Sequence, residues 1–308
     1  MKRLKWIYAI IVLSLLGFLS GCKDKGPDPN APFQPKGVTA HYTFEHTTND
    51  GSGRYSPSNE EVIDINYKDS HSLTAGSAAE FNGTTSVIEV PRANEFLTSG
   101  DLTIAFWMKP DGGRKGHFVM GLGGRYGFYF EIDTLQWYNK KKKVQMCTSY
   151  DGVDSLCFEY QIWDGSGLTK NNGGFQGTII NKDVSNTGIE PIFKDAWVHV
   201  VCVYNSAKKI NTMYVNSEKV KQTDFNLWPD GNVRKKVVGV AYWGNPAPAN
   251  KLAIGFIQSR ENPIMLQTWA NYKDEYSNHF KGLIDDLWIF SVPLTDVEVQ
   301  QLYNTENK

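Results

Sequence analysis

The sequence predicts an all-β protein, a two-sheet antiparallel sandwich with long loop insertions and one short C-terminal helix. Two observations support this prediction. Short apolar runs follow one another along the chain and are separated by Gly, Asn and Asp turns, the pattern of an antiparallel β-sandwich. Aromatic residues make up 13% of the chain and 28 residues are glycine, while the charged fraction is 21%. This composition favours a strand-rich exported protein.

The expected strands are short and lie between residues 38 and 290. In chain order they are Val38–Phe44, Ala78–Phe81, Ser86–Val90, Leu102–Lys109, His117–Leu122, Gly127–Ile132, Val144–Thr148, Leu156–Trp163, Trp197–Tyr204, Ile210–Val215, Leu252–Ile257 and Leu283–Phe290. The sequence contains no internal repeat.

The last expected strand carries two adjacent carboxylates in an apolar run. Alternation along a strand places Asp285 on the same face as Leu283 and Leu287, so Asp285 should point the same way as the core residues. A carboxylate buried there needs a hydrogen-bonding partner or a metal ion. Asp286 is expected on the outward face.

A short helix is predicted from Thr295 to Tyr303. Thr295 is the candidate N-cap, and Glu298, three residues later, completes a capping box. Leu294 can pack against Val299 as a hydrophobic staple. The end of the chain is therefore predicted to be one rigid strand, turn and helix.

The first 21 residues are typical of an export signal, with a charged start, an apolar run from Trp6 to Leu19 and small residues before Cys22. They resemble a bacterial lipoprotein signal peptide, in which the cysteine of a Leu-Ser-Gly-Cys box becomes the lipidated first residue. The alternative is an uncleaved membrane anchor, but the run is shorter than the roughly 20 residues that span a bilayer. The resemblance implies lipidation at Cys22 and a place in the cell envelope. We expect the outer membrane, and the periplasmic and the surface-exposed face are both left open.

Residues 22–36 are polar and rich in proline, which predicts a flexible tether between the lipid and a domain at 37–308. The formal net charge is −1, from 32 basic and 33 acidic residues, so nothing indicates nucleic acid or an anionic partner. We expect contact with a membrane through the lipid anchor alone. The oligomeric state is left open.

Three cysteines remain after Cys22. Cys147 and Cys157 flank a predicted hairpin turn, so they form a disulfide in an oxidising envelope or stay as two reduced thiols. Spacing does not decide between these alternatives. Cys202 lies in an apolar run and is expected in the core.

Several segments occur in an order found in a known family. They are Ala78–Gly83, Val87–Pro91, Leu102–Pro110, Trp197–Val200, Met213–Asn216, Leu252–Gly255 and the C-terminal strand, turn and helix. Together they resemble the laminin-G-like, concanavalin A-like lectin and glucanase domains of bacterial surface proteins, over about residues 37 to 305. The resemblance implies a two-sheet jelly roll. This chain departs from the family in long excursions at 110–197, 216–251 and 258–280, where specificity is usually built.

The same resemblance implies a structural calcium ion between the end of the first strand and the last strand. Carboxylates suited to it are Glu45, Asp50 and Asp285, since Ca²⁺ prefers six to eight oxygen ligands. In the alternative interpretation Asp285 accepts ordinary hydrogen bonds and Asp50 belongs to a turn.

A second pattern runs from Glu131 through Asp133 to Gln136 and resembles the Glu-x-Asp-x-x-Glu motif of laminarinase-type glucanases. Retaining hydrolysis needs a nucleophilic carboxylate and a second carboxyl group that donates a proton. Gln136 stands where the proton donor belongs and cannot transfer a proton. The enzyme class is therefore left uncertain, and the pattern argues more against catalysis than for it.

Aromatic residues in the inserted segments are the third candidate site. Sugar rings stack their CH faces on Trp and Tyr, while neighbouring polar groups bind the hydroxyls. The candidates are Trp137, Tyr138, Trp163, Trp228, Trp243, Trp269 and Tyr272. In the alternative interpretation these side chains pin long loops to the sandwich.

The sequence as a whole favours a lipid-anchored, non-catalytic envelope protein that binds a polysaccharide or oligosaccharide on its inserted loops. A divergent glucanase that uses Glu131 and Asp133 is the enzymatic alternative. A protein-binding, adhesin-like module is the third, because the same fold supports it.

Overall fold

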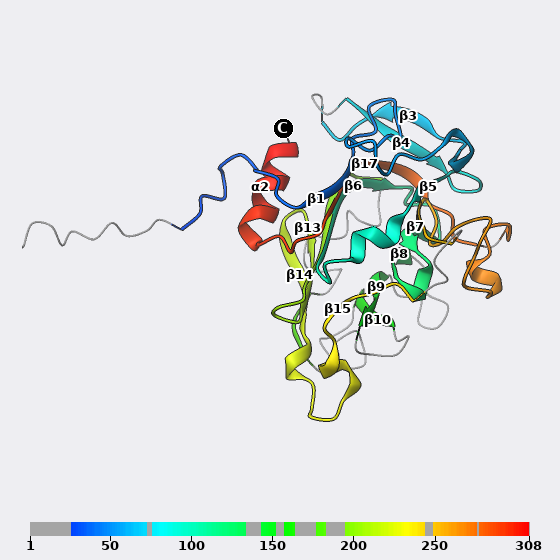
Figure 1. The fold of residues 1–308 in the computed structure, drawn as a ribbon. Coiled ribbons are helices and arrows are strands. Elements are labelled where there is room, and N and C mark those ends of the chain that lie inside the picture. The colour runs from blue at the N-terminus through cyan, green and yellow to red at the C-terminus, as the bar shows by residue number, and fades with distance from the viewer. Residues whose placement is uncertain are drawn as a thin grey trace, which may run out of the picture.

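The computed structural model is a sandwich of two antiparallel sheets (Figure 1), and the predicted fold class is confirmed. It describes residues 26–72, 76–133, 143–151, 157–163, 177–182, 195–243, 249–275 and 277–307. Among these residues no helix is long and apolar enough to cross a membrane.

Sheet A is the larger of the two sheets. Its strands in spatial order are β11 (Thr178–Asn181), β14 (Glu218–Asp224), β13 (Ile210–Val215), β12 (Val198–Asn205), β6 (Leu102–Pro110), β17 (Lys281–Phe290), β4 (Ser77–Asn82) and β3 (Asn66–Asp69), with β1 (Val38–Tyr42) also paired to β17. Because β6 and β17 lie at the centre, the C-terminal strand is held on both sides.

Sheet B faces it. Its strands in spatial order are β10 (Cys157–Trp163), β9 (Lys143–Asp151), β8 (Phe128–Asp133), β7 (Gly116–Leu122), β16 (Lys251–Ile254), β5 (Val87–Pro91) and β2 (Val62–Ile63), with β15 (Gly239–Val240) paired to β9. Short 3-10 helices lie in the connections, at η1 (Asn59–Glu61), η2 (Ala93–Leu97), η3 (Gly124–Tyr126), η6 (Phe225–Leu227), η7 (Val233–Lys236) and η8 (Thr268–Ala270).

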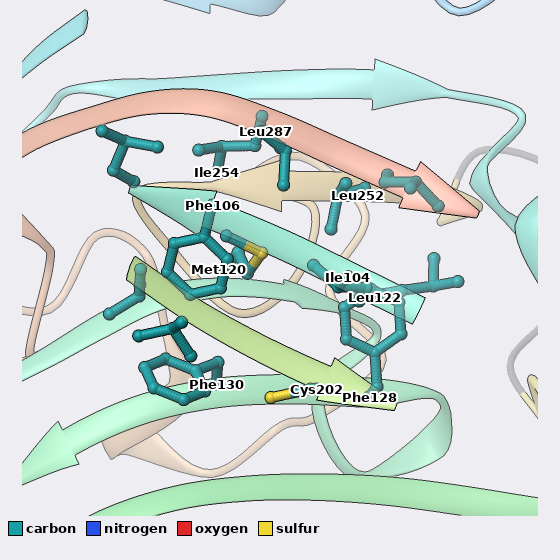
Figure 2. Close-up of a cluster of buried hydrophobic side chains, with 14 of the residues drawn as sticks. Ile104, Phe106, Met120, Leu122, Phe128, Phe130, Cys202, Leu252, Ile254 and Leu287 are labelled. Carbon is teal, nitrogen blue, oxygen red and sulfur yellow. The ribbon is translucent and has the colours of Figure 1, made fainter. Parts of the chain in front are cut away.

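The core fills the space between the two sheets (Figure 2). Alternate residues of each strand point into it, so Ile104 and Phe106 of β6 meet Phe128 and Phe130 of β8. The rings of Phe106 and Phe130 pack edge to face, with 5.4 Å between their centroids. Cys202 is buried here, as predicted.

The residues of β17 that point toward the core differ from those predicted. Asp285 pairs with Trp107 and Trp288 pairs with Ala105, so β17 holds one extra residue, a β-bulge. Asp286 takes a left-handed conformation there, with φ of 42°. After the bulge Leu287 enters the core, whereas Asp285 lies on the outer face of sheet A. Asp285 is fully buried, but it is not beside the core residues.

The C-terminal helix, α2 (Asp296–Glu306), covers this outer face (Figure 1). The predicted capping box is present: Glu298 N donates to Thr295 Oγ1 at 3.3 Å, and Thr295 N donates to Glu298 Oε2 at 2.8 Å. Leu294 and Val299 are buried in the same apolar cluster, as a staple requires.

The polar segment before β1 also packs on this face. Phe33 is 8% exposed and lies edge-on to Trp288 and Phe290. Its backbone N donates to Thr305 Oγ1 at 3.1 Å, and Gln301 Nε2 donates to the carbonyl oxygen of Asp28 at 2.7 Å. The C-terminal half of the expected flexible tether is therefore attached to α2 and β17.

The end of α2 covers a group of buried polar side chains. Glu306 accepts hydrogen bonds from the indole nitrogens of Trp107 at 2.8 Å and Trp288 at 2.6 Å. Burial raises the pKa of Glu306 well above its usual range. The His71 ring stacks on Trp107, 4.1 Å away, and its Nε2 donates to the backbone carbonyl of Glu306 at 3.1 Å.

The predicted hairpin around residue 152 forms from β9 and β10, and its register separates the two cysteines. Cys147 pairs with Glu159, and Cys157 pairs with Ser149. They are therefore diagonal neighbours, about 7–8 Å apart. This is more than the Cα separation that a disulfide usually spans, and the two side chains lie outside the described part of the chain.

The anchoring role of Phe33 is testable. Replacing Phe33 with Ala should lower the free energy of unfolding by about 2–3 kcal/mol, because it removes a buried ring at the edge of an apolar cluster. Gln34→Ala, at an exposed neighbouring position, is the control and should have almost no effect. Urea unfolding of the two variants measures this, and equal stabilities would show that the segment is not attached.

A pH effect follows from His117, which is 1% exposed. Its Nδ1 accepts from Lys281 N at 3.3 Å and its Nε2 donates to the carbonyl oxygen of Asp111 at 3.0 Å, so the ring is neutral. Burial lowers its pKa to about 4. Its contribution to stability is therefore complete above the unfolded pKa of about 6.5 and is lost as the pH falls toward 4.

We expect wild type to lose about 2 kcal/mol more unfolding free energy than His117→Gln between about pH 7.5 and about pH 5. Burial raises the pKa of Asp285 to about 6, which gives the opposite trend, but that contribution is common to both proteins and cancels. Chemical unfolding at both pH values measures the difference. Parallel losses in the two proteins would contradict the role of His117.

Candidate functional site

The 258–280 segment covers the outer face of sheet B. Phe118, Tyr129 and Ala253 point outward from their strands and pack in one cluster with Phe256, just before this segment, and with Met265 within it. One buried amide organises the segment. Gln258 Oε1 accepts from the backbone nitrogens of Ile264 and Met265, and its Nε2 donates to the carbonyls of Met265 and Ala270. The segment is thus a fixed cover of the sheet.

A charged contact fixes the start of the same segment. Glu89 of β5 is fully buried, and its Oε1 accepts from the backbone nitrogen of Arg260 at 2.7 Å. The Arg260 Nε lies 3.3 Å and the Lys251 Nζ 3.8 Å from Glu89 Oε2. Two cations therefore balance one buried carboxylate, as a buried charge requires.

Three large aromatic side chains remain exposed around η3, the turn between β7 and β8. Trp243 is 40% exposed, Trp269 is 39% exposed and Tyr126 is 36% exposed. Trp243 N donates to the carbonyl oxygen of Tyr126 at 2.6 Å, which attaches the 241–243 segment to η3. We call Arg125, Tyr126, Trp243 and Trp269 the η3 surface.

The other side of η3 contacts η8. The guanidinium carbon of Arg125 lies 5.7 Å from the centre of the Trp269 ring, a cation–π contact. Arg125 N also donates to Met265 Sδ at 3.3 Å. Trp269 and Trp243 therefore border the same short turn although they lie in different insertions, and the turn adds a ring and a cation between them.

The remaining aromatic candidates fall elsewhere. Trp228 packs partly buried against the core, with the Arg234 guanidinium 4.7 Å from its ring, so it pins the loop that holds η6 and η7. Tyr272 is half-buried, and its hydroxyl donates to the carbonyl of Thr85. Trp137 and Tyr138 lie outside the described residues, as does the side chain of Trp163.

Two members of the η3 surface were missed from the sequence. Arg125 and Tyr126 stand in Gly123-Gly124-Arg125-Tyr126-Gly127, between two predicted strands. Glycines on both sides of an Arg-Tyr pair signal a tight turn with displayed side chains. The sequence could therefore have predicted this turn, but it does not show which other loops approach the turn.

The two carboxylates of the glucanase-like pattern lie on β8. Phe130 and Ile132 point into the core, so Glu131 and Asp133 point to the outer face of sheet B. Glu131 pairs across the sheet with Phe118, whose ring is 6.0 Å from that of Trp269. Gln136 lies outside the described residues.

The three predicted calcium ligands each accept hydrogen bonds from neighbouring protein groups. The Glu45 carboxylate accepts from Ser77 N at 3.1 and 3.3 Å. Asp50 Oδ1 accepts from His41 N at 2.9 Å, and Asp50 Oδ2 accepts from the hydroxyl of Ser52. Asp285 accepts from the hydroxyl of Ser70 and from Asp286 N.

Within the described part of the chain, one group of three acidic or histidine side chains brings its ligand atoms within 4.8 Å of one another, and it is His71, Asp285 and Asp286. It shares only Asp285 with the predicted set and includes an imidazole, whereas Ca²⁺ prefers oxygen ligands. The calcium site therefore stays a prediction from the sequence.

This arrangement gives a simple expectation for metal removal. A metal that binds the folded state alone raises its stability by RT ln(1 + [L]/Kd). Because Glu45, Asp50 and Asp285 each accept hydrogen bonds from neighbouring groups, we expect about 1 mM Ca²⁺ and an excess of EDTA to give melting temperatures within about 1 °C of each other. Differential scanning calorimetry measures this, and a calcium-dependent rise of several degrees would contradict it.

Comparison with known proteins gives similarity in structure and not in sequence. No family model and no curated protein matches the chain. The binding domain of Paraclostridial Mosquitocidal Protein 1 superposes with a TM-score of 0.54 at 14% identity, over 90% of this chain and 52% of that one. The ligand-binding domain of botulinum neurotoxin serotype D, solved with N-acetylneuraminic acid, has a TM-score of 0.53 at 11% identity, over 87% and 50%.

This chain therefore spans about half the length of the toxin domains that it matches. At such low identity the likeness concerns the fold alone. It agrees with the two-sheet sandwich described above.

Proposed function

We propose that this protein is a lipid-anchored, non-catalytic carbohydrate-binding protein of the cell envelope, which holds a polysaccharide or oligosaccharide on the η3 surface. The convergence of exposed aromatic side chains from three separate connections supports this most directly. Trp243, Tyr126 and Trp269 come from the β15–β16, β7–β8 and β16–β17 connections, respectively.

The physical basis is the two-sided chemistry of a sugar ring. Its CH face stacks on an indole or phenol ring, and its hydroxyls bind polar groups at the edge. The η3 surface offers three rings together with the Arg125 guanidinium, which can donate to hydroxyl or carboxylate oxygens. The buried Gln258 amide fixes the segment that holds Trp269, so this side of the surface is ordered before a ligand binds.

The position of the docked N-terminal segment is consistent with this proposal. Phe33 and α2 lie on the outer face of sheet A, whereas η8 lies on the opposite side of the sandwich (Figure 1). Lipidation at Cys22, an outer-membrane location and the laminin-G-like assignment belong to the proposal and rest on the sequence. The toxin domain solved with N-acetylneuraminic acid is a precedent for sugar recognition by a similar fold.

Hydrolysis is the competing activity, and one observation keeps it testable. Glu131 and Asp133 point to the same outer face that the η3 surface borders. Incubation with any polysaccharide that binds, followed by a reducing-sugar assay, separates the two functions. Release of sugar that disappears in Glu131→Gln would establish an enzyme, and binding without release supports the non-catalytic proposal.

Binding to the η3 surface makes a specific prediction. Trp269→Ala and Trp243→Ala should each weaken binding about tenfold, because each removes a stacking ring worth about 1–1.5 kcal/mol. Affinity electrophoresis through gels that contain soluble polysaccharides measures this retardation. Trp269→Phe retains an aromatic face and should keep most of the affinity.

Leu227→Ala is the matched control for surface changes, since Leu227 is 53% exposed and lies in η6, away from η3. It should bind as wild type does. Failure of every polysaccharide to retard the wild-type protein, or equal retardation of wild type and the double variant Trp243→Ala/Trp269→Ala, would reject the η3 surface as the binding site.

A further inference from the structure

A second candidate binding site lies on the outer face of sheet A, far from the η3 surface. It is a depression with a cavity volume of about 580 Å³, at the end of the sheet where β3, β4, β17 and β6 run side by side. Charged and amide side chains form most of its lining, and no exposed aromatic side chain is among them.

Strand register builds the floor of this depression. Leu283 of β17 pairs with Glu80 on one side and with Lys109 on the other, and Glu80 pairs in turn with Asn66. Paired residues lie on the same face of a sheet, so these four side chains form one row. Gly282, next to Leu283, alternates to the opposite face of β17 and lines the depression with its backbone alone.

One wall is held in place before any ligand binds. Lys281 Nζ lies 2.7 Å from Asp111 Oδ2, and this ion pair lowers the pKa of Asp111. His117 supports the same turn from behind, because its Nε2 donates to the carbonyl oxygen of Asp111. Asp195 Oδ1 accepts from Gly112 N at 3.0 Å and so fixes the neighbouring loop.

Groups in the row are available to a ligand. Lys109 and the Asn66 amide have no hydrogen-bond or ion-pair partner within the described ranges of the chain. Glu80 has a loose contact, with its Oε2 3.9 Å from Lys68 Nζ. The row thus offers ammonium and amide donors at its two ends and a carboxylate acceptor between them.

The charges around the depression balance. Three lysines line it, Lys68, Lys109 and Lys281, and so do three acids, Glu80, Asp111 and Asp195. Equal numbers of opposite charges create no strong net field that would concentrate an anion or a cation. A neutral ligand with many hydroxyl groups satisfies both signs, because each hydroxyl donates and accepts.

The spacing of the strands places the two charged ends of the row on either side of Leu283. Glu80 and Lys109 lie on the two strands that flank β17, so their Cα atoms are about 10 Å apart. Because both side chains rise from the same face of the sheet, their charged ends can bind hydroxyls on opposite edges of one sugar ring. Leu283, between them, gives that ring an apolar floor.

We propose that this depression is a second carbohydrate site, which takes one neutral hexose unit of an oligosaccharide. The ring lies over Leu283 and Gly282, its hydroxyls donate to Glu80, and they accept from Lys109 and Asn66. The site is on the other sheet from the η3 surface and does not depend on it. Evidence against binding at one site therefore does not count against binding at the other.

Isothermal titration calorimetry of the full-length chain tests this site. The neutral probes are laminaritetraose, cellotetraose, maltotetraose and mannotetraose, and tetragalacturonate is the charged control. Because the η3 surface is a second place where these sugars can bind, the titrations use the Trp243→Ala/Trp269→Ala variant as background. We expect at least one neutral tetrasaccharide to bind this background protein.

In the same background, Lys109→Met and Glu80→Gln should each weaken binding about tenfold, since each removes a charged hydrogen-bonding partner of the sugar. Lys235→Met, at a partly exposed lysine of η7, is the control and should leave binding unchanged. Both row positions lie on the surface of paired strands, and circular dichroism confirms that each variant is folded.

The proposal fails if no neutral tetrasaccharide binds the background protein, or if Lys109→Met and Glu80→Gln both bind as the background protein does. Tighter binding of tetragalacturonate than of every neutral probe overturns the assignment to a neutral sugar. If the η3 surface of the wild-type protein binds no sugar while the depression on sheet A still does, the function proposed for the η3 surface is rejected and the proposal for the depression stands.

Discussion

The extra residue in β17 determines what each face of sheet A contacts. Without the bulge at Asp285 and Asp286, alternation would send Leu287 outward and turn Trp288 toward the core. With it, Leu287 joins the core, while Trp288 and Phe290 form the apolar face on which Phe33 and α2 pack. The left-handed backbone at Asp286 makes this possible, and an aspartate adopts that conformation more readily than a branched apolar residue does.

The same bulge places a carboxylate beneath the end of α2. Asp285 faces His71 there, with Oδ2 3.4 Å from Nδ1, and the Glu306 carboxylate lies close by, held by two indole donors. Burial of such groups costs free energy unless hydrogen bonds compensate, and here each carboxylate has at least two donors. The cluster therefore adds specificity to the way α2 docks more than it adds stability.

Sequence patterns predicted the sandwich well because alternation and turn residues are local signals. They failed where contacts between segments distant in the sequence determine which side chains are buried. Trp228 and Trp243 stand in similar surroundings, each beside Pro, Gly or Asn, yet Trp228 packs on the core and Trp243 is exposed. β14 was missed because its sequence, Glu-Lys-Val-Lys-Gln-Thr-Asp, is typical of a polar loop. Its Lys221 is nevertheless almost fully buried. The phase of Asp285 was wrong because alternation does not reveal a bulge, and the η3 surface needed knowledge of which loops meet.

The docked N-terminal segment gives the proposed anchor a consequence for orientation. Five residues lie between Cys22 and Asp28, the first residue whose backbone binds α2, and an extended chain over these six Cα steps reaches about 20 Å. A lipid on Cys22 would thus hold the outer face of sheet A near the membrane. A long flexible tether would instead let the domain rotate freely. The η3 surface lies on the opposite sheet and would face away from the bilayer, where a long polysaccharide can reach it. A short, docked leader therefore suits a protein that presents the η3 surface to a long polysaccharide.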